Sequence, residues 1–223
     1  MLIQARIKTE KPNISGLRQK GCTIVDLHSH TTCSDGIMEV SQLLDKAKEL
    51  GISIAITDHN EIKGSLHALK HPRGVMVIPG LEFHPFEGMH LLAYFYNERE
   101  MAEFYRKHIE KYKGSNCLAN LNVNSEELVE AAKDYNGIIS GAHPFAIGWV
   151  GLCKHDGNDR IDQRLLQKID ALEVINGGNL QRWNKKAIKI AYDIPIAITG
   201  GSDAHTLPEV GSAVTYTQQL HTR

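Results

Sequence analysis

Short apolar runs alternate with amphipathic stretches along most of this 223-residue chain. Apolar runs bounded by turn residues are typical of buried strands, and apolar side chains at three- and four-residue spacing are typical of helices. The stretch from Val40 to Leu50 shows the helical spacing clearly and ends at Gly51. Continuous apolar strands alternating with helices predict a parallel sheet buried on both faces, and about seven such units in one domain predict an α/β barrel.

The same patterns give the expected bounds of each element. We expect strands at residues 24–28, 52–57, 75–78, 89–96, 138–142, 171–175 and 194–199, with 212–217 as a candidate last strand. We expect helices at residues 40–50, 61–69, 98–112, 125–135, 161–169 and 180–192. Asn124, with Glu127 three residues later, is a typical start for the fourth of these helices.

Length and composition are those of one compact enzyme-sized domain. We expect a single barrel domain over residues 23–223, preceded by an arm or an extra strand at residues 1–22, where Pro12 and Gly16 interrupt regular structure. A hydrophobic fraction of 42% suffices for a packed core. The formal net charge of -1 excludes an overall basic surface for nucleic acid, but it is compatible with a local groove.

Cysteine usage and hydropathy indicate the compartment. The four cysteines are scattered without paired spacing, which is typical of reduced thiols in a cytosolic protein. No run approaches the ~20 apolar residues of a membrane span, and the first residues lack the apolar segment of a signal peptide. We therefore expect a cytoplasmic protein without membrane contact, and the sequence leaves its oligomeric state open.

Metal-ligand side chains recur where the expected strands end. Those at or just past a strand end are His28, His30, His59, Glu82, His143, Asp203 and His205, and Asp35 follows in a loop. His90 departs from the rule, because it opens its strand. The carboxyl ends of barrel strands converge on one face, so these side chains should meet there. An isolated pair such as His28 and His30 could equally be one core and one surface histidine, but the repetition favours a metal site.

Nine donors are too many for one tetrahedral ion. Imidazole and carboxylate together suit zinc, manganese or iron, and the number of donors favours two or three divalent ions with Glu82 or Asp203 as a bridge. Clustered ions of this kind commonly serve displacement at phosphorus. The sequence therefore predicts a polynuclear metal centre for phosphate chemistry.

Six short motifs, in order, resemble those of the PHP (polymerase and histidinol phosphatase) superfamily, over roughly residues 23–217. They are Asp26-Leu27-His28-Ser29-His30-Thr31 with Ser34-Asp35-Gly36, Ile56-Thr57-Asp58-His59-Asn60, Gly80-Leu81-Glu82, His90-Leu91-Leu92-Ala93-Tyr94, Ala142-His143-Pro144 and Gly201-Ser202-Asp203-Ala204-His205. The later part is similar to the C-terminal half of small stand-alone PHP metal-dependent phosphoesterases. The resemblance implies a distorted (β/α)7 TIM-like barrel with the metal site at the C-terminal ends of its strands.

The resemblance also implies how the donors divide among three ions. His28, His30, Glu82 and Asp203 would hold one ion, Glu82 would bridge to a second held by His90 and His143, and Asp35, His59 and His205 would hold a third. Some relatives have a histidine at the position of Asp35. A metal-activated hydroxide would attack phosphorus, and the third ion, held by Asp35 and His205, would assist the leaving group. Asp58 would orient a ligand without binding metal itself.

Other side chains are weaker candidates with an ordinary alternative. Arg182 begins a basic helical stripe that could guide a polyanion, or could simply be a solvated face. Lys154 and His155 lie in a loop that could meet a substrate phosphate, or could be solvated. His84 could compete with His90 as a ligand, or could be a loop histidine near the mouth.

The leading functional hypothesis is a metal-dependent phosphoesterase, a hydrolase acting on a small phosphorylated metabolite, a nucleotide or a short oligonucleotide. The segment between Tyr96 and Asn136 is too short for the sizeable inserted domain of some nucleotide-specific relatives. A non-catalytic or regulatory metal-binding module is one alternative, although no ligand is missing here. A polynuclear amidohydrolase is another, although no lysine stands at a strand end.

Overall fold

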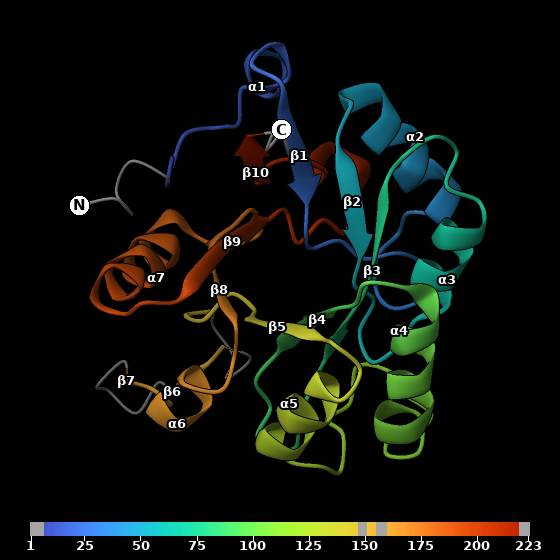
Figure 1. Ribbon diagram of the computed structural model, residues 1–223, viewed down its shortest axis with the longest axis vertical. Helices are drawn as coiled ribbons and strands as arrows, with labels where there is room; N and C mark the ends of the chain where they lie inside the picture. Colours follow the sequence, from blue (N-terminus) through green and yellow to red (C-terminus); the bar gives the residue numbers. More distant parts are fainter. Residues whose placement is uncertain (1–6, 147–150, 155–159, 219–223) are drawn as a thin grey trace, which may run out of the picture.

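Eight of the described strands form one sheet that curls into a nearly closed barrel (Figure 1). The computed structural model describes residues 7–146, 151–154 and 160–218. In spatial order the strands are β10 (Thr215–Gln218), β1 (Cys22–Asp26), β2 (Ser53–Ile56), β3 (Val77–Phe83), β4 (Leu91–Tyr94), β5 (Ile138–Gly141), β8 (Ala171–Asn176) and β9 (Ala197–Gly201). A parallel bridge between Ser29 and Ala204 joins the ends of β1 and β9 at the rim. The predicted α/β barrel is confirmed.

The direction of β4 differs from the simple alternation expected from the sequence. β4 runs antiparallel to both β3 and β5, and Phe83 at the end of β3 pairs with Leu91 at the start of β4. The start of β4 therefore lies at the same rim as the ends of the parallel strands. His90 opens its strand and still faces the shared rim, which explains the exception in the pattern of strand ends. β10 also runs antiparallel, along β1.

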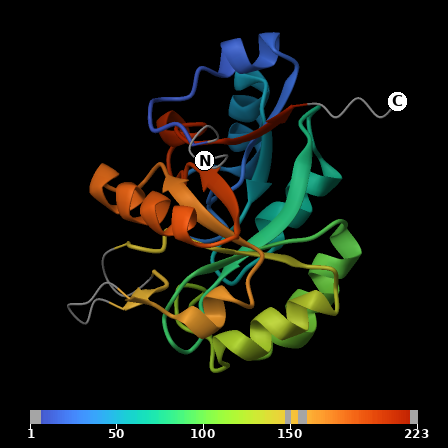
Figure 2. The ribbon, with the colours of Figure 1, turned by 60° about the vertical axis from the view of Figure 1, so that its left-hand side comes forward.

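The helices lie outside the strands, as the two views show (Figures 1 and 2). They are α1 (Ile14–Gln19), α2 (Val40–Leu50), α3 (Lys63–Lys70), α4 (Glu98–Phe104), α5 (Ser125–Lys133), α6 (Gln163–Leu166) and α7 (Gln181–Asp193). In α2 the apolar face is buried, and Gly51 ends the helix in the left-handed conformation that glycine favours. The Asn124 side chain accepts from the backbone N–H of Glu127, which confirms the predicted helix start.

Three segments differ from their expected structure. Residues 14–19 form the helix α1, where an extra strand was one expectation for the N-terminal segment. The expected helix at 98–112 divides into α4 and a π-helical segment, η2 (Tyr105–Ile109). The expected helix at 161–169 shortens to α6, because Ile161 pairs in a small hairpin of β6 (Cys153–Lys154) and β7 (Arg160–Ile161). A 3-10 turn, η3 (Leu207–Glu209), precedes β10.

Two apolar clusters pack along the strands, a large one around β3, β4, β5 and β8 and a smaller one around β1 and β2. A third, small cluster of Ala55, Leu92, Tyr94 and Ala142 lies on the other face of the strands. Among the described helices, none combines the length and the apolar character that crossing a bilayer requires. The polar interior residues concentrate at the carboxyl rim, where the barrel holds its candidate site.

Candidate metal centre

Glu82, at the end of β3, is the centre of a cage of imidazoles and carboxylates. Its side chain is fully buried, and its two oxygens face five histidines. Oε2 lies 3.4, 3.5 and 2.8 Å from ring nitrogens of His28, His30 and His59, and Oε1 lies 3.1 and 3.2 Å from those of His90 and His143. Asp203 Oδ1 lies 3.3 Å from His28 Nε2 and 3.1 Å from His30 Nε2. Side chains from six segments of the chain therefore meet at one point.

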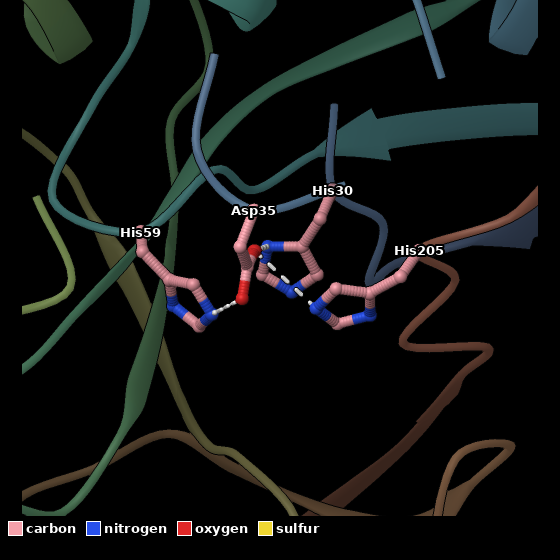
Figure 3. Close-up of side chains that lie close together, drawn as sticks. All are labelled: His30, Asp35, His59 and His205. Atoms are coloured by element: carbon pink, nitrogen blue, oxygen red, sulfur yellow. Dashed lines mark ion pairs between the residues drawn. The ribbon is translucent and has the colours of Figure 1, made fainter. Parts of the chain in front are cut away.

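The cage has two parts. We call His28, His30, Glu82, His90, His143 and Asp203 the inner group and Asp35, His59 and His205 the outer group. In the outer group, Asp35 Oδ2 lies 3.3 Å from His59 Nε2, and Asp35 Oδ1 lies 3.3 Å from His205 Nε2 (Figure 3). His30 links the groups, since its Nδ1 lies 3.7 Å from Asp35 Oδ1. The structure thus brings together all nine donors predicted from the sequence.

Glu173 supports the inner group, although it was not among the site residues predicted from the sequence. Its Oε1 lies 3.0 Å from His28 Nδ1, and its Oε2 accepts from the His143 backbone N–H at 2.8 Å. Asn176 Nδ2 donates to Glu173 Oε2 and to Asp203 Oδ2. A proton on His28 Nδ1 leaves the Nε2 lone pair directed into the cage. The available signal was a charged residue inside an otherwise apolar strand.

The outer group is held by its own backbone and loop contacts. His205 Nδ1 hydrogen-bonds the Asp203 carbonyl at 2.8 Å, which turns Nε2 toward Asp35. Asp58 is buried and accepts from the Thr31 backbone N–H at 2.7 Å and from the Ser34 hydroxyl at 2.8 Å. These bonds fix the loop that carries Asp35. Asp58 therefore has the contacts of a residue that orients the site.

Two donors sit on strained backbone. His143 has a φ of 24° and Asp203 a φ of 55°, both in the left-handed region that residues with a side chain rarely adopt. Such a conformation costs of order 1–3 kcal/mol and persists where the surroundings hold it. Here Glu173 holds the His143 N–H, and Asp203 N–H donates to the His28 carbonyl. Strain at these positions fits residues held in place for binding or chemistry.

Several buried polar atoms of the inner group have no hydrogen-bond partner. Among the described residues they include His28 Nε2, both ring nitrogens of His30, Glu82 Oε2 and His143 Nδ1. Each unsatisfied buried group costs about 1–3 kcal/mol. Divalent cations would satisfy these inward lone pairs together. The donor set, rich in imidazole with bridging carboxylates, therefore fits zinc, manganese or iron.

Electrostatics in the metal-free cage favour protons on the outer histidines. Burial opposes a charge on His59, but Glu82 and Asp35 outweigh it and raise its pKa to about 10. A hydrogen bond with Asp35 raises the pKa of His205 to about 9. Burial lowers the pKa of His30 to about 4, whereas the histidines around Glu82 hold the pKa of its carboxyl well below the usual range despite burial. An ion that binds the outer group would therefore displace protons from His59 and His205.

His84 is a further member of the cage. It is 3% exposed, so it is not an open loop histidine at the mouth. Its Nε2 lies 2.6 Å from His59 Nδ1, and its ring stacks on that of His90 at a centroid distance of 3.7 Å. Burial lowers the pKa of His84 to about 2, so the ring is neutral. Its spacing of two residues after Glu82 was the signal for this position.

The expected substrate-binding residues remain predictions. Arg182 is exposed in the first turn of α7, with its guanidinium 4.8 Å from the centre of the Trp183 ring. Lys154 lies in β6, where its backbone pairs with Arg160. His155 lies outside the described residues. Within the described parts, no contact links Arg182 to the cage.

Comparison with known sequences identifies the family. The sequence pattern of the PHP domain matches residues 26–179, and that of the PHP-associated region matches residues 181–221. An uncharacterized protein of Methanocaldococcus jannaschii is 30% identical over 165 residues, which cover 68% of this chain and 80% of that protein.

Solved structures show the same fold. A protein of Bifidobacterium adolescentis, described as a metal-dependent phosphoesterase, matches with a TM-score of 0.59 and 20% identity, over 82% of this chain and 87% of its own. Endonuclease Q of Pyrococcus furiosus matches with a TM-score of 0.63 and 25% identity, over 83% of this chain, which spans about half (49%) of that enzyme. An amidohydrolase of Chromobacterium violaceum matches with a TM-score of 0.59 and 15% identity, over 85% of this chain and 90% of its own.

The domain match covers well over half of the chain, and each of the six motifs contributes at least one side chain to the cage. This protein therefore belongs to the PHP domain family.

Proposed function

We propose that this protein is a metal-dependent phosphoesterase that hydrolyses an ester of a small phosphorylated metabolite, a nucleotide or a short oligonucleotide. The observation that carries the proposal is the state of Glu82. Its Oε2 is buried without a hydrogen bond, within 3.5 Å of ring nitrogens of His28, His30 and His59. A carboxylate oxygen surrounded in this way fits a cluster of cations.

We infer that the inner group holds two ions through Glu82 and that the outer group holds a third. His28, His30, Glu82 and Asp203 would hold the first, Glu82, His90 and His143 the second, and Asp35, His59 and His205 the third, as the short distances within each set suggest. When bound, such ions lower the pKa of a water molecule and neutralise charge on phosphoryl oxygens.

The chain's own residues would bind, orient and exclude water. Burial of the inner group strengthens every electrostatic interaction there, because water does not screen it. Glu173 and Asn176 fix His28 and Asp203, so little reorganisation is needed during reaction. The half-exposed Asp35 and His205 mark the side from which a phosphate ester would approach. Arg182, Lys154 and His155 are candidates for contacts with its phosphate.

The comparisons bear on substrate class and on the rival functions. A solved complex of endonuclease Q contains duplex DNA with an abasic lesion, which supports an oligonucleotide as one candidate substrate. The complete donor set argues against a regulatory module that has lost its ions. The amidohydrolase neighbour keeps amide hydrolysis as the rival activity.

The test is turnover with defined metals. Protein loaded with zinc, manganese or iron(II) is assayed on chromogenic phosphate monoesters and diesters, then on a library of phosphorylated metabolites. We expect metal-dependent phosphate release that Asp203→Asn abolishes together with bound metal. Asp45→Asn is the matched control, because Asp45 pairs with Arg73 on the surface. Bound metal with no release of phosphate, and turnover of amides instead, would overturn the proposal.

A further inference from the structure

We propose that His84 is a positioning residue that accepts the Nδ1 proton of His59 and thereby directs His59 Nε2 to the ion of the outer group. This inference rests on the metal centre of the proposed function. It adds a residue to the nine donors and assigns it a role other than ligation.

The contact between the two rings requires one shared proton. His84 Nε2 and His59 Nδ1 lie 2.6 Å apart, a distance at which two lone pairs or two N–H groups would repel. His59 Nδ1 also lies 2.8 Å from Glu82 Oε2, a carboxylate oxygen that can only accept. A bare lone pair on His59 Nδ1 would face that oxygen unfavourably. The proton therefore sits on His59, and His84 is the acceptor.

Whether the His59 Nδ1 proton points to His84 or to Glu82 decides whether the Glu82 Oε2 lone pairs are available to cations. Although His59 Nδ1 is close to Glu82 Oε2, that oxygen makes no hydrogen bond, whereas the contact with His84 has hydrogen-bond geometry. His84 thus draws the proton away from the bridging carboxylate. Glu82 Oε2 keeps its lone pairs for cations, and His59 Nε2 faces Asp35 Oδ2 at 3.3 Å.

His84 is held in the orientation that this role needs. Its backbone N–H donates to Asn60 Oδ1 at 3.0 Å, and its carbonyl accepts from the Leu121 N–H at 2.7 Å. In a neutral imidazole one ring nitrogen donates and the other accepts, so a proton on His84 Nδ1 leaves Nε2 as the acceptor.

Stacking argues against His84 as a ligand beside His90. The two rings are 3.7 Å apart and only 2° from parallel. Imidazole lone pairs lie in the ring plane, so those of two parallel rings do not converge on one tetrahedral ion. The stack instead fixes the His84 ring in position. Partners that orient a metal-bound histidine in this way are worth about 10–100-fold in metal affinity.

The experiment compares two variants of His84 by ¹⁵N NMR of histidine rings during titration with zinc alone. His84→Phe keeps a stacking ring but removes the acceptor, and His84→Gln keeps an acceptor oxygen. We expect His84→Phe to weaken zinc binding at His59 Nε2 by about 10–100-fold and to lose the Nδ1–H tautomer of His59. His84→Gln should retain the tautomer and most of the affinity. His67→Gln, at an exposed histidine, is the control for lost surface imidazole.

The possible results distinguish a failure of the positioning role of His84 from a failure of the proposed metal centre. Unchanged zinc affinity and tautomer in His84→Phe would overturn the positioning role alone. Equal loss in both variants, with direct zinc coordination at His84, would also overturn it, because His84 would then be a ligand. Wild-type protein that takes up no zinc at His59 would contradict the proposed centre as well. If His84→Phe fails to fold, the ¹⁵N NMR spectrum of the zinc-loaded wild type still tests the role. A His59 ring that carries no proton on Nδ1 in that spectrum would contradict the positioning role of His84.

Discussion

The inner and outer groups of the cage use the same donor types in different surroundings. His28 and Glu82 of the inner group have fully buried side chains, whereas Asp35 and His205 of the outer group are 31% and 35% exposed. The inner donors are braced by Glu173 and Asn176, and the outer donors by loop and backbone contacts. Under the proposed function, this difference in burial predicts that the inner group retains its ions and that the outer group exchanges with solvent and substrate.

The largest effect should come from the residue that joins the two halves. Glu82→Gln removes the negative charge among five imidazoles and leaves a single acceptor oxygen. We expect loss of metal from both groups and a fall in phosphoesterase activity of about a thousandfold. Metal analysis of the purified variant measures this, with Glu49→Gln on the surface as the control. Retention of either group's ion would show that the halves assemble independently of Glu82.

Substitution of one aspartate in each group should distinguish the two groups by the metal content that each variant retains. Asp35→Asn should remove the outer ion alone and lower activity by about a hundredfold, because among the inner donors Asp35 approaches only His30, at 3.7 Å. Asp203→Asn should remove the ions of the inner group in addition to the outer ion. Metal content per chain and turnover are measured together. Identical metal content in the two variants would contradict the division into groups.

Substitutions of the residues that hold the donors in place, Glu173 and Glu209, should have smaller effects, and these effects on zinc affinity should differ between the two groups. Glu173 accepts from three donors with two oxygens, so Glu173→Gln leaves too few acceptors. We expect inner-group zinc affinity to fall by about tenfold or more. Glu209 accepts from the backbone N–H groups of His205 and Thr206, at an exposed position. Glu209→Gln should change outer-group affinity by less than about threefold, as zinc competition titrations would show. Equal effects would argue against different bracing of the halves.

The smallest expected difference between the two groups is in the pH dependence of their zinc affinity. The pKa values of His59, about 10, and His205, about 9, lie above the ordinary 6.5, so both are protonated at pH 7 without metal. Outer-group zinc affinity should therefore rise with pH, by about tenfold per pH unit for each proton displaced. These raised pKa values stabilise the metal-free fold fully below pH 6.5, and that stability is lost as pH rises through about 9 and 10.

Calorimetry across this pH range checks the proton release, and thermal unfolding checks the stability. Zinc-loaded protein should not show the alkaline loss of stability, because its outer histidines carry no proton on Nε2. An outer-group zinc affinity that is flat between pH 6 and 8 would contradict proton displacement.

The sequence sufficed to predict the barrel and the meeting of the nine candidate donors at one rim, because strand ends converge by geometry alone. It did not reveal that β4 runs antiparallel, since an apolar run has no direction; His90 only looked exceptional for that reason. Glu173 was overlooked because no local spacing links it to His28, which is 145 residues away. The role of His84 depends on ring orientation and on a contact with His59, which spacing along the chain cannot specify.

The most direct test of the metal centre is anomalous diffraction from crystals of the zinc- or manganese-loaded protein. We expect anomalous peaks about 2.0–2.2 Å from nitrogens and oxygens of the inner and outer groups, with Glu82 between two of the peaks. Peaks elsewhere, or a cage without peaks in protein that hydrolyses phosphate esters, would contradict it.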